Sequence, residues 1–510
     1  MEMNYAKTVE KWGTLEVAVK GPKEGNPFCD QWIKGTFECK NEKKTVDGFY
    51  DGDGVYKVRF MPSFVDTYTF KIESSFQTES AEEVSGSFEA VAPSADNHGP
   101  VRVAGTYYLA YEDGKPYHCI GTTCYVWNLQ NEKLQEQTLK TLEENAFNKI
   151  RFCIFPKHYD YNLHEPITYP YEGTPCDTSE LNENNFAEYN GCAPGNDWDF
   201  TRFNPAHFQH IEKCIQALMN LGIEADLIVM HPYDRWGFSM MKAEDDDRYW
   251  KYVLARFSAY RNVWWSLANE YDLMHEKTLA DWERYAAIIC EKDPYHHLRS
   301  IHNCKAYYDY NLPWVTHCSI QRTETYRSSE LVNEWREKYH KPVVLDEICY
   351  EGNIQFGWGN ISGEEMTRRF WEAFCRGGYP GHGETYLSPD RILWWSHGGV
   401  LHGTSPERIK FLAKIMEETP GLGVEPMPCK WDEVACRAAG FPARKDYFIY
   451  YYTFMRPSFR DFYFDDTTEY QVEIIDTWEM TITDGGIHKG KFRVQLPGKE
   501  YIAVRIKAVK

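Results

Sequence analysis

The chain has 510 residues, and its 76 acidic and 56 basic residues give a formal net charge of −20. This length predicts about three domains. The acidic excess, with no basic block, argues against nucleic acid as a partner, and the absence of a long apolar run argues against a membrane partner.

The N-terminal stretch "MEMNYAKTVEKWG" lacks the apolar segment that follows a basic start in signal peptides. The 15 cysteines are scattered, many of them inside apolar runs, and none forms a CxxC pair with zinc spacing. We therefore expect free thiols, a cytoplasmic location, and neither a metal nor another cofactor.

Residues 1–95 carry short stretches in which apolar and polar residues alternate, such as "TLEVAVKGP", "VYKVRFMP" and "TYTFKIES". Alternation of this kind is typical of strands with one buried face. The polar segment "VAPSADNHGP" follows and resembles a linker. We predict an N-terminal β-sandwich over residues 1–95.

Residues 100–420 alternate short apolar runs with amphipathic stretches. One such stretch places Phe208, Ile211, Ile215 and Leu218 on one helical face and stops at Gly222. Eight strand–helix units predict a (β/α)8 barrel. The eight runs are "YHCIGTTCYVW", "KIRFCIF", "EADLIVM", "NVWWSLAN", "LRSIHN", "WVTHCSI", "PVVLDEI" and "ILWWSH".

Two further regions complete this organisation. A long insertion rich in Tyr, Asn and Pro, residues 157–205, is expected to shape a pocket. From residue 425 to 510 the strand pattern returns in "DYFIYYYTF", "EYQVEIID" and "YIAVRIKAV", which predicts a second small β-sandwich. The predicted fold class is α/β: a TIM barrel flanked by two small all-β domains, which either brace the barrel or bind sugar.

The fourth and seventh runs both end in acidic residues. "NVWWSLANEYDL" ends in Asn269-Glu270, and "KPVVLDEICYEG" ends in Asp346-Glu347. Strands four and seven lie across the mouth of a barrel, where active sites form. Two facing carboxylates suit glycoside hydrolysis, in which one is protonated and the other ionised. Strand alternation puts Asp346 and Glu347 on opposite sides, and Glu347 is favoured over Asp346 and Glu351.

This pattern resembles the retaining glycoside hydrolases of clan A. The resemblance implies that Glu270 is the acid/base, Glu347 the nucleophile, and Asn269 a donor to the sugar 2-hydroxyl. It also implies that Arg151 steadies the nucleophile. The strand-eight tryptophan that forms a sugar platform corresponds to Trp395, with Trp394 as the alternative.

A narrower resemblance covers the whole chain. "GFYDGDGVYKVRFMP" and "NHGPVRV" resemble the immunoglobulin-like domain that precedes cellulase-like and apiosidase-like barrels. "KPVVLDEICYEG" resembles the strand-seven motif of the apiosidase-like group. The strand-four pair Asn269-Glu270 differs from that group, which carries an Asp there, and follows the wider clan.

Further candidates for binding a sugar follow other runs. They are Trp127, His158, His231, His302, His317, and His382 with Glu384 in "PGHGETY". A histidine at a strand end can bond sugar hydroxyls, and each can equally be a structural residue. The predicted function is a retaining glycosidase acting on short oligosaccharides or glycosides, with homo-oligomerisation left open. The alternatives are a carbohydrate-binding protein on an inactive barrel and a transglycosidase that uses the same residues.

Overall fold

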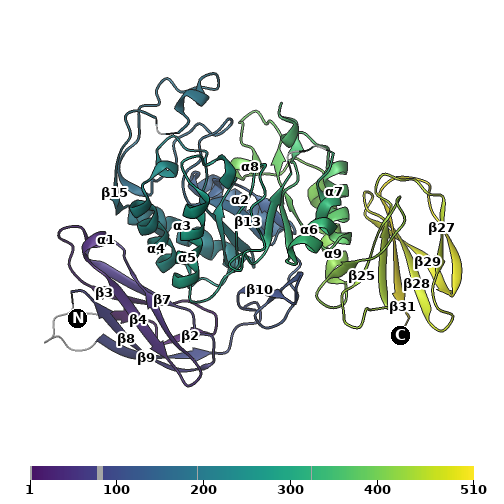
Figure 1. Cartoon of the computed structure of the whole chain (residues 1–510), viewed down its shortest axis with the longest axis horizontal. Coiled ribbons are helices and arrows are strands. Elements are labelled where there is room, and N and C mark those ends of the chain that lie inside the picture. Colours follow the sequence, from purple (N-terminus) through teal and green to yellow (C-terminus); the bar gives the residue numbers. More distant parts are fainter. Residues whose placement is uncertain (1–2, 77–83, 192, 323, 325, 510) are drawn as a thin grey trace.

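The structure is a computed structural model that describes residues 3–76, 84–191, 193–322, 324 and 326–509. Figure 1 shows a β domain at the N-terminus, a central barrel surrounded by helices, and a second β domain at the C-terminus. The predicted fold class is therefore confirmed. Within the described ranges, no helix combines the length and the apolar character that a membrane span requires.

The N-terminal domain consists of two sheets. Their strand orders are β1-β3-β7-β6 and β2-β9-β8-β4-β5. Alternation in the sequence places Val17, Phe37 and Phe70 in the core between them. The strands are β1 Met3–Tyr5, β2 Thr8–Glu10, β3 Leu15–Lys20, β4 Ile33–Glu38, β5 Lys43–Asp47, β6 Phe49–Tyr50, β7 Val55–Phe60, β8 Asp66–Ser74 and β9 Val84–Val91.

The central domain contains eight parallel strands in the order β18-β17-β16-β13-β12-β22-β20-β19. A parallel bridge between His302 and Ser319 joins the first and last of them and closes the barrel. In chain order the strands are β12 Gly121–Thr123, β13 Lys149–Cys153, β16 Glu224–Met230, β17 Val263–Ala268, β18 Arg299–Ser300, β19 Cys318–Gln321, β20 Val343–Glu347 and β22 Tyr379–His382.

Helices follow seven of the eight strands, and residues 301–317 after β18 contain none. The helix predicted up to Gly222 is present: the Asn204 side chain caps it, Pro205 occupies its first turn, and Gly222 follows with φ +71°. The main helices are α2 Glu132–Glu144, α3 Pro205–Asn220, α4 Ala243–Phe257, α5 Leu279–Lys292, α6 Val332–Tyr339, α7 Gly363–Cys375 and α9 Ser405–Glu417.

The prediction of the eighth strand was wrong. "ILWWSH" forms the short helix α8 (Trp394–His397), whereas the eighth strand is β22, which reads "YPGH". Proline and glycine are poor strand formers, so β22 gives a weak sequence signal. Gly381 is nevertheless required there, because a Cβ at this position would lie 2.8 Å from the carbonyl oxygen of Asp346.

The C-terminal domain is a six-stranded sheet, in the order β24-β25-β26-β31-β28-β29, with a two-stranded ribbon, β27-β30. Its own core includes Tyr470, Val472 and Val504. The strands are β24 Val424–Pro426, β25 Val434–Ala438, β26 Tyr447–Tyr451, β27 Phe459–Tyr463, β28 Glu469–Asp476, β29 Thr481–Lys489, β30 Lys491–Gln495 and β31 Ile502–Ala508.

The insertion 157–205 contains a hairpin of β14 (Tyr171–Thr174) and β15 (Asp197–Phe203). Phe203 stacks on Tyr252 of α4 with ring centroids 4.1 Å apart, and it also contacts Phe28 of the N-terminal domain. The second strand of this hairpin therefore ties the barrel to the first domain, whereas Lys157 and Tyr159 at the start of the insertion line the barrel mouth.

Candidate active site

A cavity of about 480 Å³ lies at the carboxyl end of the barrel strands, and both Glu270 and Glu347 line it. Active sites of this fold form at that end. Aromatic side chains make up much of its wall: Tyr125, Tyr159, Tyr233, Tyr350, Trp358 and Trp395. The structure thus places the two predicted catalytic glutamates in one aromatic pocket.

Glu270 follows strand β17 and is 6% exposed. Its backbone is left-handed, with φ 53° and ψ 56°, a conformation that is costly for a residue with a Cβ and is concentrated at functional sites. The hydroxyl of Tyr233 donates to its Oε2, and Nε2 of Gln321 donates to its Oε1 at 2.6 Å. These donors come from the ends of strands three and six, so neighbouring strands orient the carboxyl group.

Glu347 is the last residue of strand β20. The hydroxyl of Tyr125 donates to its Oε1. Arg151 Nη1 approaches the same atom to 3.3 Å, and His302 Nε2 to 3.4 Å. None of these three contacts involves Oε2, which is therefore the oxygen better placed to react.

The environments of the two glutamates shift their pKa values in opposite directions. Burial raises the pKa of Glu270 above its ordinary value, and the negative charge of Glu347 raises it further. Burial would also raise the pKa of Glu347, but its hydrogen bond to His302 and the charges of His302 and Arg151 lower it to about 2. At neutral pH this arrangement favours a proton on Glu270 and an ionised Glu347.

Asn269 lies between the two carboxyl groups. Its Oδ1 accepts a hydrogen bond from Arg151 Nη2 at 3.0 Å. The Tyr125 hydroxyl lies 3.2 Å from the same oxygen, but its single proton is directed at Glu347. The arginine fixes the amide orientation, so the Asn269 Nδ2 is on the side of Glu270, 3.4 Å from Oε2. An amide held this way presents a donor beside the acid/base candidate.

Lys157, four residues after β13, lines the same pocket although it is only 3% exposed. Its Nζ lies 3.5 Å from the ring centroid of Tyr125, 4.3 Å from that of Tyr233 and 4.5 Å from that of Trp395. Burial lowers its pKa to about 8. An ammonium group among aromatic faces is a donor available to an oxygen-rich ligand.

Of the residues predicted to bind sugar, Trp395 lines the pocket, while Arg151, Asn269 and His302 do not line it but contact the glutamates. Five further candidates, all within the described chain, lie away from it. Trp127 is fully buried against Phe152. His158 contacts the carbonyl of Phe186 and Nη1 of Arg235, and His231 contacts the carbonyl of Phe155. The structure thus places these three side chains in the packing behind the pocket.

The other two are His317 and His382. His317 precedes the first residue of β19, at the amino end of the barrel, so it cannot reach the mouth. His382 is the last residue of β22 and bonds Thr122. Trp395 lines the pocket from α8, while Trp394 is buried and donates to Thr122.

Several pocket residues were not predicted from the sequence. Tyr125, Lys157, Tyr233 and Gln321 all lie within four residues of the carboxyl end of a strand. A survey of every polar or aromatic residue just beyond each predicted strand would have found them. His302, one of the candidates from the sequence, contacts Glu347 directly.

Comparison with known proteins gives the family of the barrel. A family model described as the apiosidase-like catalytic domain matches residues 104–420. Two models described as domains of unknown function, DUF5060 and DUF5605, match residues 8–75 and 431–507. Among curated protein sequences, none matches the chain significantly.

Two solved structures from Bacteroides vulgatus are similar to the chain. One, described as a proposed glycoside hydrolase, is 38% identical with a TM-score of 0.90, over 99% of this chain and 100% of that one. The other, a family 5 glycoside hydrolase, is 16% identical with a TM-score of 0.60, over 81% and 93%, and supports the fold alone. The chain therefore belongs to the apiosidase-like family of glycoside hydrolase barrels.

Proposed function

We propose that the protein is a retaining glycosidase with Glu347 as nucleophile and Glu270 as acid/base. The observation that carries the proposal is the opposite shift of the two pKa values within one pocket. A protonated and an ionised carboxyl group are the two reagents that a double displacement requires.

In the first step, Oε2 of Glu347 attacks the anomeric carbon while Glu270 gives its proton to the departing glycosidic oxygen. The C–O bond to the leaving group breaks, and an ester forms between the sugar and Glu347. In the second step, Glu270 removes a proton from water, the water oxygen attacks the same carbon, and Glu347 departs as carboxylate. Arg151, His302 and Tyr125 stabilise the negative charge that returns to Glu347.

The size and lining of the pocket favour short substrates. A cavity of about 480 Å³ suits a ligand of one or two sugar rings. The Trp395 ring, which meets Tyr125 edge to face with centroids 5.8 Å apart, lines the pocket and offers an apolar surface for a sugar.

The test is a panel of aryl glycosides and short oligosaccharides, followed by proton NMR of the first product. We expect cleavage with the same anomeric form in product and substrate. Glu347→Gln should abolish turnover but retain sugar binding, and a 2-fluoro glycoside should label Glu347 in the wild type. Initial inversion, or sugar binding without any cleavage, would overturn the proposal.

A further inference from the structure

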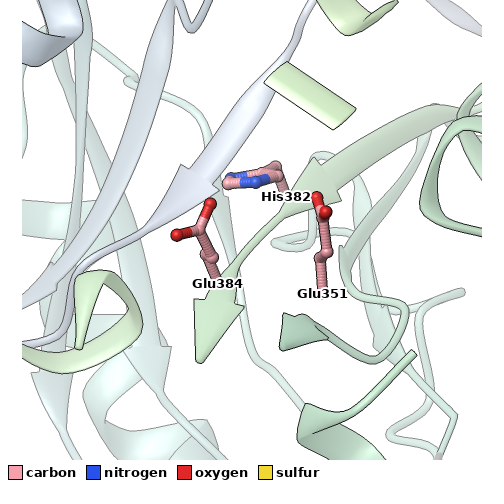
Figure 2. Close-up of side chains that lie close together, drawn as sticks. All are labelled: Glu351, His382 and Glu384. Atoms are coloured by element: carbon pink, nitrogen blue, oxygen red, sulfur yellow. The ribbon is translucent and has the colours of Figure 1, made fainter. Parts of the chain in front are cut away.

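A second group of titratable side chains lies outside the pocket. Figure 2 shows the carboxylates of Glu351 and Glu384 on either side of the His382 ring. Each offers one ligand atom, and these atoms all lie within 4.8 Å of one another. All three residues are at most 1% exposed. Glu351 lies in β21 (Glu351–Gly352), and Glu384 in β23 (Glu384–Thr385), which pairs with β21 in parallel.

The charge of this group is not balanced by protein side chains. In the described part of the chain, neither Glu351 nor Glu384 makes an ion pair with a lysine or arginine. Two buried carboxylates without a cation are costly. A bound proton or a bound cation would offset this charge.

His382 supplies an independent observation. Its Nδ1 lies 3.1 Å from Oγ1 of Thr122, and that oxygen accepts a hydrogen bond from Trp394 Nε1 at 2.8 Å. Among the residues that the structure describes, its Nε2 has no hydrogen-bond partner, although His382 is fully buried. Buried polar atoms are nearly always paired, so this nitrogen beside two carboxylates indicates a missing ligand.

Backbone N–H groups hold both carboxylates in place. Glu384 accepts from the N–H of His402 at 2.5 Å and of Gly403 at 2.8 Å. Glu351 accepts from the N–H of Thr404 at 2.7 Å and of Ser405 at 3.1 Å. Outer hydrogen bonds of this kind orient the ligands in metal sites.

Gly403 allows the two carboxylates to approach the same point. A Cβ at this position would lie 2.5 Å from Oε2 of Glu351 and 2.7 Å from Oε2 of Glu384. Any larger residue would push one carboxylate away.

We propose that Glu351, His382 and Glu384 bind a divalent metal ion with a structural role. One imidazole and two carboxylates are a ligand set suited to Zn²⁺ or Mn²⁺, and the nitrogen argues against Ca²⁺. When each ligand atom bonds a metal ion at about 2.1 Å, two ligand atoms lie no more than about 4.2 Å apart. The ligand atoms here lie within 4.8 Å of one another, so only a small movement is needed on binding. Water completes the coordination.

The position of the site gives the ion its role. It joins the segment after strand seven, the segment after strand eight and the start of α9. Tyr350, next to Glu351, lines the active-site pocket. A bound ion would thus secure one wall of that pocket. The inference does not rest on the proposed glycosidase activity.

The first experiment measures the metal content of the purified full-length chain by mass spectrometry. We expect about one Zn²⁺ or Mn²⁺ per chain. Removal with EDTA should lower the Tm by several degrees, and adding back either ion alone should restore it. A metal-free wild type whose Tm responds to neither ion would overturn the proposal.

The second experiment separates a metal from a shared proton. Without an ion, burial raises the pKa of Glu384 to about 8, so Glu384 would hold the proton. Glu384→Gln imitates that protonated state. If the site binds metal, this variant and His382→Gln lose the ion and the response of the Tm to EDTA. His207→Gln is the matched control, because both ring nitrogens of His207 are already partnered. Retention of the ion in Glu384→Gln, or a Tm equal to that of the metal-loaded wild type, would contradict the assignment.

Discussion

Gln321 at the end of strand six donates a 2.6 Å hydrogen bond to Oε1 of Glu270 at the end of strand four. This bond favours the ionised form of Glu270 and opposes the effect of burial. Gln321 therefore helps to set the pKa of Glu270, the proposed acid/base.

Gln321→Leu should raise the pKa of Glu270 further. The basic limb of the pH profile of kcat/KM should move up by about one unit, since a hydrogen bond to a charged group contributes about 1.5–3 kcal/mol. Hydrolysis of the glycosyl intermediate at neutral pH should slow about tenfold or more. In that step Glu270 acts as a base, and more of it would already be protonated. Gln216→Leu, on α3, is the control and should leave the profile in place. A downward shift of the limb in Gln321→Leu would refute this role.

The sequence predicted the barrel and the two glutamates because both signals are local. Each glutamate directly ends an apolar run, and the order of the runs places them on strands four and seven. The eighth strand could not be found this way, because Pro380 and Gly381 have low strand propensity. Gly381 is required there by the close approach of the Asp346 backbone.

Most of the predicted histidines do not line the pocket, and the reason is different. Whether a histidine near a strand faces the pocket depends on the residue at which the strand begins. An apolar run in the sequence does not identify that residue. His317 precedes the first paired residue, Cys318, and so lies at the opposite end of the barrel. Lys157 was missed because a lysine after a strand ordinarily indicates an exposed loop, and its aromatic surroundings come from distant segments.

His302 should control the acid limb of the same pH profile. Burial would raise the pKa of Glu347, but the hydrogen bond and charge of His302 and the charge of Arg151 together lower it to about 2. His302→Leu should move the acid limb to higher pH and lower kcat/KM at pH 5, where part of Glu347 would be protonated. His317→Leu should not move the limb. An unchanged limb in His302→Leu would show that other groups hold Glu347 ionised.

The same shift has a consequence for stability. Because the folded-state pKa of Glu347 lies below its ordinary value, its carboxylate stabilises the fold above about pH 4.5. That contribution is lost as the pH falls towards 2. In His302→Leu, the folded-state pKa moves closer to the ordinary value, so the loss should be smaller and should end at a higher pH. Acid titration followed by circular dichroism would measure it.

Two buried lysines, one at the start of β13 and one four residues after its end, should respond to the same substitution in opposite ways. Lys149 donates to Asp226 at 2.7 Å and to Asp346 at 2.6 Å, and its pKa is raised despite burial. Lys157 lies among aromatic rings, and burial lowers its pKa to about 8. A lysine that is less basic when folded costs stability below pH 8, and the stability rises with pH between about 8 and 10.5.

Lys157→Met should therefore raise the free energy of unfolding at pH 7 by about 2–3 kcal/mol and lower kcat/KM, because the pocket loses its ammonium donor. Lys149→Met should lower the free energy of unfolding by about 3–5 kcal/mol, since two buried carboxylates lose their lysine partner and keep only the longer 3.8 Å pairs with Arg151. Urea unfolding at pH 7 and at pH 9.5 measures both effects. A Lys157→Met variant that is destabilised and fully active would show that the lysine serves packing.

A buried ionic network between the N-terminal domain and the barrel indicates that this domain braces the barrel. Arg59 of β7 donates to Glu212 of α3 at 2.6 and 2.9 Å, and Arg256 of α4 donates to Glu212 at 2.7 Å. Arg256 also pairs with Asp51 of the first domain at 2.7 Å.

Glu212→Ala removes the acceptor that both arginines share, so it should destabilise the protein by about 3–5 kcal/mol. At temperatures where the variant is folded, kcat/KM should match the wild type, because none of these residues lines the active-site pocket. Glu417→Ala, at an exposed position on α9, is the control and should leave the Tm unchanged. Thermal unfolding and limited proteolysis near the domain junction measure the effect. Loss of activity without loss of stability would mean that the first domain acts on the active site itself.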